Sequence, residues 1–195
     1  MTPTTWPAGG AQLLEPSISY ALDAVLAVTP ELLSHKTPCR DWDLRMLLRH
    51  AVESMATLGE GIETGRVGLD SAAEDGDLAA DPVRAFRDRA GYLLDAWARP
   101  GHQRQIIEIA GCPLAAGVMA AAAALEVAVH GWDISRACGQ RQPIPRALAT
   151  DLLVIAPALV PRTGRQPLFA APIDVAATAC PSDQLAAFLG RSRAW

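Results

Sequence analysis

Apolar side chains recur along most of the chain at spacings of three and four residues, the repeat that places side chains on one face of an α-helix. Leu44, Leu47, Leu48, Ala51 and Met55 follow this repeat closely. The pattern predicts helices over about residues 17–33, 41–61, 82–99, 113–137 and 145–159.

The segments between these helices carry residues that form turns. Residues 1–15 predict an irregular N-terminal segment. Residues 65–81 contain several acidic residues and are interrupted by glycine and alanine, which predicts an exposed loop. Residues 105–109 predict a short β-like piece. The proline-containing residues 161–195 predict an irregular extension or a short strand pair, with a final turn of helix over 183–189.

Several predicted helix ends carry cap residues. Asp41 or Asp43 can accept hydrogen bonds from the free backbone N–H groups at the start of the second helix. Asp81 followed by proline opens the third helix, and Gly139 is a natural end for the fourth. With the periodicity, these signals predict a mainly all-α fold, a helical bundle with one short β-like segment.

The chain has 195 residues, the usual size of a single domain. We expect one domain over 1–195, with the bundle over about 15–160 and a C-terminal extension over about 161–195. Apolar residues make up 50% of the chain, which is enough for a sizeable core and too many for a disordered protein.

Charge and hydropathy exclude several classes of protein. The net charge is −4 with no basic run, which argues against nucleic-acid binding. The longest apolar run, residues 114–125, is shorter than the roughly 20 residues of a membrane span and predicts a buried helix segment. Residues 1–10 show no secretory signal, so we expect a cytoplasmic protein whose four cysteines stay reduced.

Two residues that could bind a metal lie on the fourth predicted helix. Glu126 and His130 stand at i and i+4, so their side chains share one helix face. Their neighbours are alanine, valine and leucine, and a carboxylate buried there needs a partner or a cation. Antiparallel packing of the second and fourth helices can bring His50 to this face. Two imidazoles and one carboxylate form a ligand set of zinc and non-haem iron sites.

Simpler interpretations of these residues stay open. A Glu–His pair at this spacing is often only a hydrogen-bonded pair, and a histidine on an apolar face is more often a core residue than a ligand. His35 and His102 lie at helix breaks and are expected at the surface. The start of the second helix can lower the pKa of Cys39, but small buried side chains are the simplest expectation for all four cysteines.

Four segments together resemble one family. Residues 37–50 (TPCRDWDLRMLLRH), 126–133 (EVAVHGWD), 135–140 (SRACGQ) and 183–195 (DQLAAFLGRSRAW) are similar, in the same order, to motifs of the mycothiol-dependent maleylpyruvate isomerase-like proteins. The last segment is similar to the tail of a metal-binding subgroup. The resemblance implies a DinB-like four-helix bundle. Cys138 stands where the family usually has threonine; we favour an isosteric change in the core over a place near the site.

The resemblance also implies site residues. His50, Glu126 and His130 match the family's ligands for a divalent metal, with zinc favoured and iron, nickel or manganese as alternatives. Asp133, Trp132 and Arg136 are candidates for the surrounding shell. Asp133 can orient His130 or make a structural hydrogen bond, and these two interpretations stay equally open.

The implied activity is thiol-dependent chemistry. The metal would activate a thiol for transfer to a small electrophile or for cis–trans isomerisation. The family's isomerase carries a further C-terminal domain for which this chain is too short, which favours transfer. A non-catalytic metal-binding or stress protein, or a structural bundle with a degenerate site, is the alternative. A homodimer is a possible assembly.

Arginine usage bears on the identity of the thiol. Lys36 is the only lysine among the 17 Lys and Arg residues, so 16 are arginine, and alanine is abundant. This bias is typical of a GC-rich genome such as that of an actinobacterium, where mycothiol is the main low-molecular-weight thiol. We therefore expect mycothiol as the cosubstrate.

Overall fold

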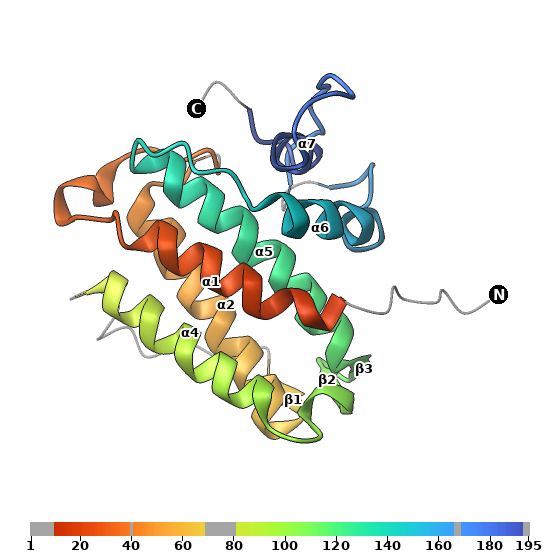
Figure 1. Cartoon of the computed structure of the whole chain (residues 1–195). Coiled ribbons are helices and arrows are strands. Elements are labelled where there is room, and N and C mark those ends of the chain that lie inside the picture. The colour runs from red at the N-terminus through yellow and green to blue at the C-terminus, as the bar shows by residue number, and fades with distance from the viewer. Residues whose placement is uncertain (1–9, 40, 69–80, 166–168, 193–195) are drawn as a thin grey trace.

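A computed structural model describes residues 10–39, 41–68, 81–165 and 169–192 (Figure 1). Its α-helices are α1 (Leu14–Val25), α2 (Leu44–Thr64), α4 (Pro82–Ala98), α5 (Ala116–Ala137), α6 (Arg146–Leu159) and α7 (Pro181–Phe188). Its 3-10 helices are η1 (Gly10–Leu13), η2 (Pro30–Ser34) and η3 (His102–Arg104), and its strands are β1 (Arg66–Val67), β2 (Ile106–Ile109) and β3 (Cys112–Ala115). The mainly helical DinB-like fold predicted from the sequence is confirmed.

Helices α1, α5, α2 and α4 pack on one another in that cyclic order, since α4 also contacts α1 (Figure 1). Leucine, isoleucine and alanine side chains from all four fill the space between them. The end of α2 and the start of α5 both adjoin the small sheet, so these two helices run antiparallel. This is the packing that the sequence required for His50 to approach Glu126 and His130.

Helix α5 is buried on almost every side. Among the described residues it is the one helix long and apolar enough to cross a membrane by length and composition, yet 72% of its apolar window is buried inside the fold. Its small residues let neighbouring helices approach closely. A Cβ atom added at Gly131 would lie 2.9 Å from the Cα of Ala21 in α1. Glycine at this position therefore permits the α1–α5 contact.

Gly131→Ala is expected to destabilise the protein by about 1–3 kcal/mol, because the added methyl group overlaps the backbone of α1. Gly91→Ala in α4 is the matched control: its Cβ would meet nothing within 4 Å, so helix propensity alone should stabilise the protein by roughly 0.5–1 kcal/mol. Urea unfolding followed by circular dichroism measures both changes. Equal effects from the two substitutions would rule out the close helix contact.

A three-stranded sheet closes one end of the bundle (Figure 1). β2 pairs antiparallel with β3, and β1 pairs parallel with β2. The β-like piece predicted over 105–109 is therefore present. The prediction that the next helix begins near Pro113 was wrong, because Ala110 and Gly111 both have positive φ and form a tight hairpin turn that returns the chain as β3.

Three other boundary predictions were wrong. The helix expected over 17–33 begins at Leu14 and ends at Val25, because Pro30 holds the preceding Thr29 in an extended conformation and starts η2 instead. Part of the loop expected over 65–81 is strand β1; residues 69–80 lie outside the described part of the chain. α2 ends at Thr64, three residues later than predicted, and the following Gly65 takes a φ of 74°.

The C-terminal segment packs on the rest of the molecule through α6, which contacts both α5 and α7. The final helix is confirmed, although it begins at Pro181 rather than at 183. Within 161–165 and 169–192 the structure has no strand pair. Instead, Leu185, Ala186 and Leu189 of this segment join the core, and the Arg165 Nη2 donates a hydrogen bond to the Phe188 carbonyl oxygen at 2.7 Å.

Candidate metal centre

The start of α2 is set by a compact turn. The Thr37 hydroxyl donates to the carbonyl oxygens of Cys39 and Trp42, each at 3.0 Å. Asp43 is the cap residue, and its side chain accepts a hydrogen bond from the Met46 N–H at 2.9 Å. Of the two predicted caps, Asp43 is thus the one used, and Asp41 takes a left-handed φ of 70° within the turn. From this start, α2 presents His50 toward α5.

Three predicted ligands converge between α2 and α5. One ligand atom each from His50, Glu126 and His130 lies within 4.8 Å of the others. The His50 Nε2 is 2.9 Å from the Glu126 Oε1. The two imidazole rings meet edge to face, with centroids 5.2 Å apart and an interplanar angle of 89°. Two nitrogen donors and one carboxylate therefore face a common point.

Two of the three side chains reach solvent. The side chains of His50 and Glu126 are each 37% exposed, whereas that of His130 is 9% exposed. His130 thus lies at the floor of the group, and the other two lie at its rim. A small molecule can approach the three donors from solvent.

Glu126 is held in its ionised form. Burial on its own raises the pKa of this carboxyl, but the hydrogen bond from His50, the charge of His130 and the hydrogen bond from Ser54 outweigh it and lower the pKa from 4.5 to about 2. The Ser54 hydroxyl donates to the Glu126 Oε1 at 2.6 Å. The carboxylate is consequently available as an anionic ligand at neutral pH.

On its other side His130 contacts Asp133. The His130 Nδ1 lies 3.2 Å from the Asp133 Oδ2, and Asp133 is fully buried. A proton on Nδ1 would be donated to Asp133 and would leave Nε2 as the nitrogen free to bind a cation. The same Oδ2 accepts a hydrogen bond from the Arg191 Nη2 at 3.2 Å. Asp133 therefore contacts His130 and also makes a buried hydrogen bond with Arg191, so both interpretations of Asp133 fit this geometry.

Trp132 and Arg136 make a separate contact. The Arg136 guanidinium carbon lies 4.7 Å from the centre of the fully buried Trp132 ring. Neither residue has a recorded hydrogen bond or ring contact with the three donors in the described part of the chain. The contact supports a scaffold role for both residues.

Two residues near the centre were not assigned a role from the sequence. The Trp42 ring lies 4.7 Å from that of His50 and 6.2 Å from that of His130, between centroids. Arg191 reaches Asp133 from the C-terminal segment. Both stand inside the quoted motifs, which were the only sequence signals that could have marked them.

The cysteines only partly follow their predictions. Cys39 and Cys138 are half-buried, but Cys112 and Cys180 are exposed, so the expectation that all four are buried was wrong. Burial raises the pKa of Cys39, whereas the sequence suggested that the start of α2 lowers it; α2 begins five residues later and is capped by Asp43. Burial also raises the pKa of Cys138, which packs against the core.

Cys39 belongs to a second group of possible ligands. One donor atom each from Cys39, His130 and Asp133 lies within 4.8 Å of the others. In this group Asp133 already accepts a hydrogen bond from the charged Arg191, which competes with a cation for the carboxylate. The group of His50, Glu126 and His130 is therefore the better candidate for a cation site.

The remaining histidines lie away from both groups. His35 is exposed, as predicted, and its Nδ1 is 3.2 Å from the Ala137 carbonyl oxygen. His102 is half-buried rather than at the surface, with its Nδ1 2.8 Å from the Ala96 carbonyl oxygen. Each ring contacts a backbone carbonyl and neither joins another ligand residue in a cluster of described residues.

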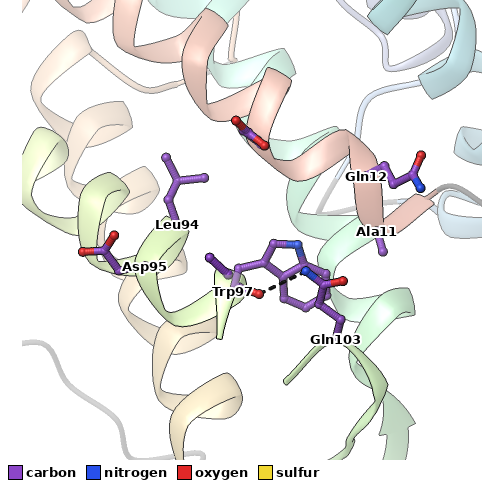
Figure 2. A pocket seen from close by; sticks show the side chains of 8 residues that line it. Ala11, Gln12, Leu94, Asp95, Trp97 and Gln103 are labelled. Atoms are coloured by element: carbon purple, nitrogen blue, oxygen red, sulfur yellow. Dashed lines mark hydrogen bonds between the residues drawn. The ribbon is translucent and has the colours of Figure 1, made fainter. Parts of the chain in front are cut away.

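A pocket of about 410 Å³ lies elsewhere, between η1, the start of α1 and the end of α4 (Figure 2). Trp97 and Gln103 line it, joined by a hydrogen bond of 3.2 Å from the Gln103 side chain to the Trp97 carbonyl oxygen. None of the three predicted metal ligands lines this pocket. It is therefore a separate feature of the surface.

Comparison with known proteins agrees with this geometry. A family model described as the mycothiol maleylpyruvate isomerase N-terminal domain matches residues 14–135, a range that contains all three candidate ligands. Two uncharacterized proteins of Mycobacterium tuberculosis, from strains CDC 1551 and H37Rv, are each 31% identical over 178 residues, covering 88% of this chain and 92% of each relative. No solved structure matches. The chain belongs to the family of the mycothiol maleylpyruvate isomerase N-terminal domain.

Proposed function

We propose that this protein is a metal- and thiol-dependent enzyme that transfers the sulfur of a low-molecular-weight thiol to an electrophilic small molecule. The observation that carries the proposal is the convergence of His50, Glu126 and His130 on one solvent-accessible point. Membership of a family described by mycothiol supports that thiol as the cosubstrate.

The donor set fits a divalent metal. Two imidazole nitrogens and one carboxylate oxygen are ligands that zinc accepts, and iron, nickel and manganese accept the same set. Each of two donors has an outer partner that fixes its orientation, Ser54 for Glu126 and Asp133 for His130. When bound, such a metal supplies Lewis acidity, which lowers the pKa of a coordinated thiol.

The protein side chains bind the metal and limit how a substrate approaches it. His50 and His130 bind through neutral nitrogens, and Glu126 supplies one negative charge at the rim. Trp42 covers one side of the His50 ring and limits the directions from which a substrate approaches. We expect a thiol and an electrophile to meet at the exposed parts of His50 and Glu126. In the transfer reaction the thiolate sulfur forms a bond to carbon, and the leaving group departs with the electron pair of its own bond.

Cis–trans isomerisation is the second candidate, favoured by the isomerase named in the family description. It uses the same thiolate, which adds to a conjugated double bond and leaves again after rotation. The two reactions differ in the fate of the sulfur, because a transferase keeps it in the product and an isomerase returns the thiol. Mass spectrometry of the products distinguishes them.

Calorimetric titration of the zinc-loaded protein with mycothiol tests the proposal. We expect saturable heat from the wild-type protein and none from Glu126→Gln, in which the rim carboxylate is replaced by a neutral amide of the same shape. Thiol-dependent turnover should then appear with a panel of epoxides, halides and enones. Zinc binding with no heat from mycothiol and no thiol-dependent turnover would instead identify a non-catalytic metal-binding protein.

A further inference from the structure

Arg191 is a buried cation at an unexpected place in the chain. It follows α7, outside the range 14–135 that the family model matches, and yet it is only 6% exposed. A buried guanidinium is costly unless an anion and hydrogen-bond acceptors surround it. The groups around Arg191 therefore show which part of the protein this segment contacts.

The partner of Arg191 is the carboxylate beneath the candidate metal centre. Its Nη2 donates to the Asp133 Oδ2 at 3.2 Å, and its Nη1 donates to the Leu189 carbonyl oxygen at 2.9 Å. Burial alone lowers the pKa of this arginine, but the charge of Asp133 and the hydrogen bond to it outweigh burial and raise the pKa. The guanidinium therefore stays charged beside a fully buried carboxylate.

One oxygen atom joins this ion pair to the metal ligand. The Asp133 Oδ2 receives both the Arg191 Nη2 and the His130 Nδ1, while the Asp133 Oδ1 has no hydrogen-bond partner in the described part of the chain. A carboxylate held through a single oxygen depends on both contacts for its position. Without Arg191, the hydrogen bond with His130 would be the one left to this carboxylate among the described residues, and the side chain would be free to move.

We propose that Arg191 is a positioning residue of the metal centre, which acts through Asp133 to fix the ring of His130. The C-terminal segment that carries it then completes a centre whose ligands all lie in the matched domain. The proposal rests on the metal site put forward under Proposed function. Coupling between sites is reciprocal, so metal binding should also stabilise the docking of residues 181–192.

Arg165 supplies the matched control. It is also an arginine of the C-terminal segment and is also 6% exposed, but its Nη2 donates to the Phe188 carbonyl oxygen and it has no recorded contact with Asp133. Its guanidinium packs against the rings of Phe169 and Phe188. Loss of Arg165 therefore perturbs the same segment without removing the contact to the centre.

The test measures the zinc affinity of the full chain by chelator competition, together with the visible absorption spectrum of the cobalt-loaded protein. Arg191→Met should weaken zinc binding about tenfold, the lower end of the effect of outer-shell partners, and should alter the cobalt spectrum. Arg191→Lys keeps the charge and should recover most of the affinity. Arg165→Met should leave both readouts as in the wild type.

A double-mutant cycle shows whether Arg191 acts through Asp133. Asp133→Asn should weaken zinc binding at least as much as Arg191→Met, and adding Arg191→Met to Asp133→Asn should cause little further loss. Hydrogen exchange should slow across residues 181–192 when zinc binds to the wild-type protein but not when it binds to Arg191→Met.

The outcomes separate the inference from the function on which it rests. If the wild-type chain binds no zinc, both are overturned. If the wild type binds zinc and the folded Arg191→Met protein binds it equally, with the same cobalt spectrum, only the positioning role is overturned. Equal losses in Arg191→Met and Arg165→Met would also overturn it, because they would indicate a general effect of the segment. If Arg191→Met does not fold, wild-type affinity in Asp133→Asn overturns the role.

Discussion

Glu126→Gln is expected to weaken zinc binding by more than about 100-fold, beyond the usual effect of outer-shell partners, because it removes a ligand and the one negative charge at the rim. The amide keeps the shape of the side chain, so the fold should be unaffected. His50→Ala and His130→Ala should cause losses of the same order. Chelator competition, with elemental analysis of protein purified without chelators, measures the effect.

His102→Ala is the control for this prediction. It removes a half-buried histidine whose Nδ1 contacts a backbone carbonyl and which lies outside the candidate ligand groups. Its zinc affinity should equal that of the wild type. If Glu126→Gln retains wild-type affinity, the ligand assignment fails, and the group formed by Cys39, His130 and Asp133 becomes the candidate to test next.

Trp132→Ala is expected to reduce the free energy of unfolding by about 3–5 kcal/mol, a large part of the stability of a domain of this size. Trp132 is among the largest fully buried side chains, so its truncation leaves a cavity beside α5. The substitution also removes the ring that the Arg136 guanidinium packs against. Urea denaturation followed by circular dichroism measures the loss of stability.

Val154→Ala in α6 is the control for that substitution. Val154 is 65% exposed, so its truncation should change stability by no more than about 0.5 kcal/mol. A loss of less than about 1 kcal/mol from Trp132→Ala would contradict the packed position of the ring. It would also reopen the possibility that Trp132 serves the metal centre rather than the scaffold.

Local sequence signals predicted the helical elements well and their boundaries less well. Asp43, Asp81 and Gly139 each lie at a helix end, as predicted, because capping depends only on residues a few positions away. The failures arose where another local signal prevailed. Pro30 divided the first expected helix, and the Ala110–Gly111 turn converted the start of the fourth into a hairpin.

The sequence predicted that His50, Glu126 and His130 would lie close together, but it did not predict the residues around them. Glu126 and His130 share a helix face by their spacing alone, and His50 joined them through its motif and its place on the second helix. Ser54 meets Glu126 across 72 residues, and Arg191 meets Asp133 across 58. Neither contact can be predicted from a repeat in the sequence, because each depends on how whole helices and the C-terminal segment pack.

By itself, the sequence therefore determined a mainly helical chain and one candidate set of metal ligands, since periodicity, caps and i, i+4 spacing are local properties. Only the tertiary structure decided that α2 and α5 run antiparallel, that Cys112 and Cys180 face solvent, and that an arginine from beyond α7 contacts Asp133, which in turn contacts His130. These features arise from burial and from contacts between residues distant in sequence. They are therefore determined by the packing of the whole molecule and not by any one segment of the sequence.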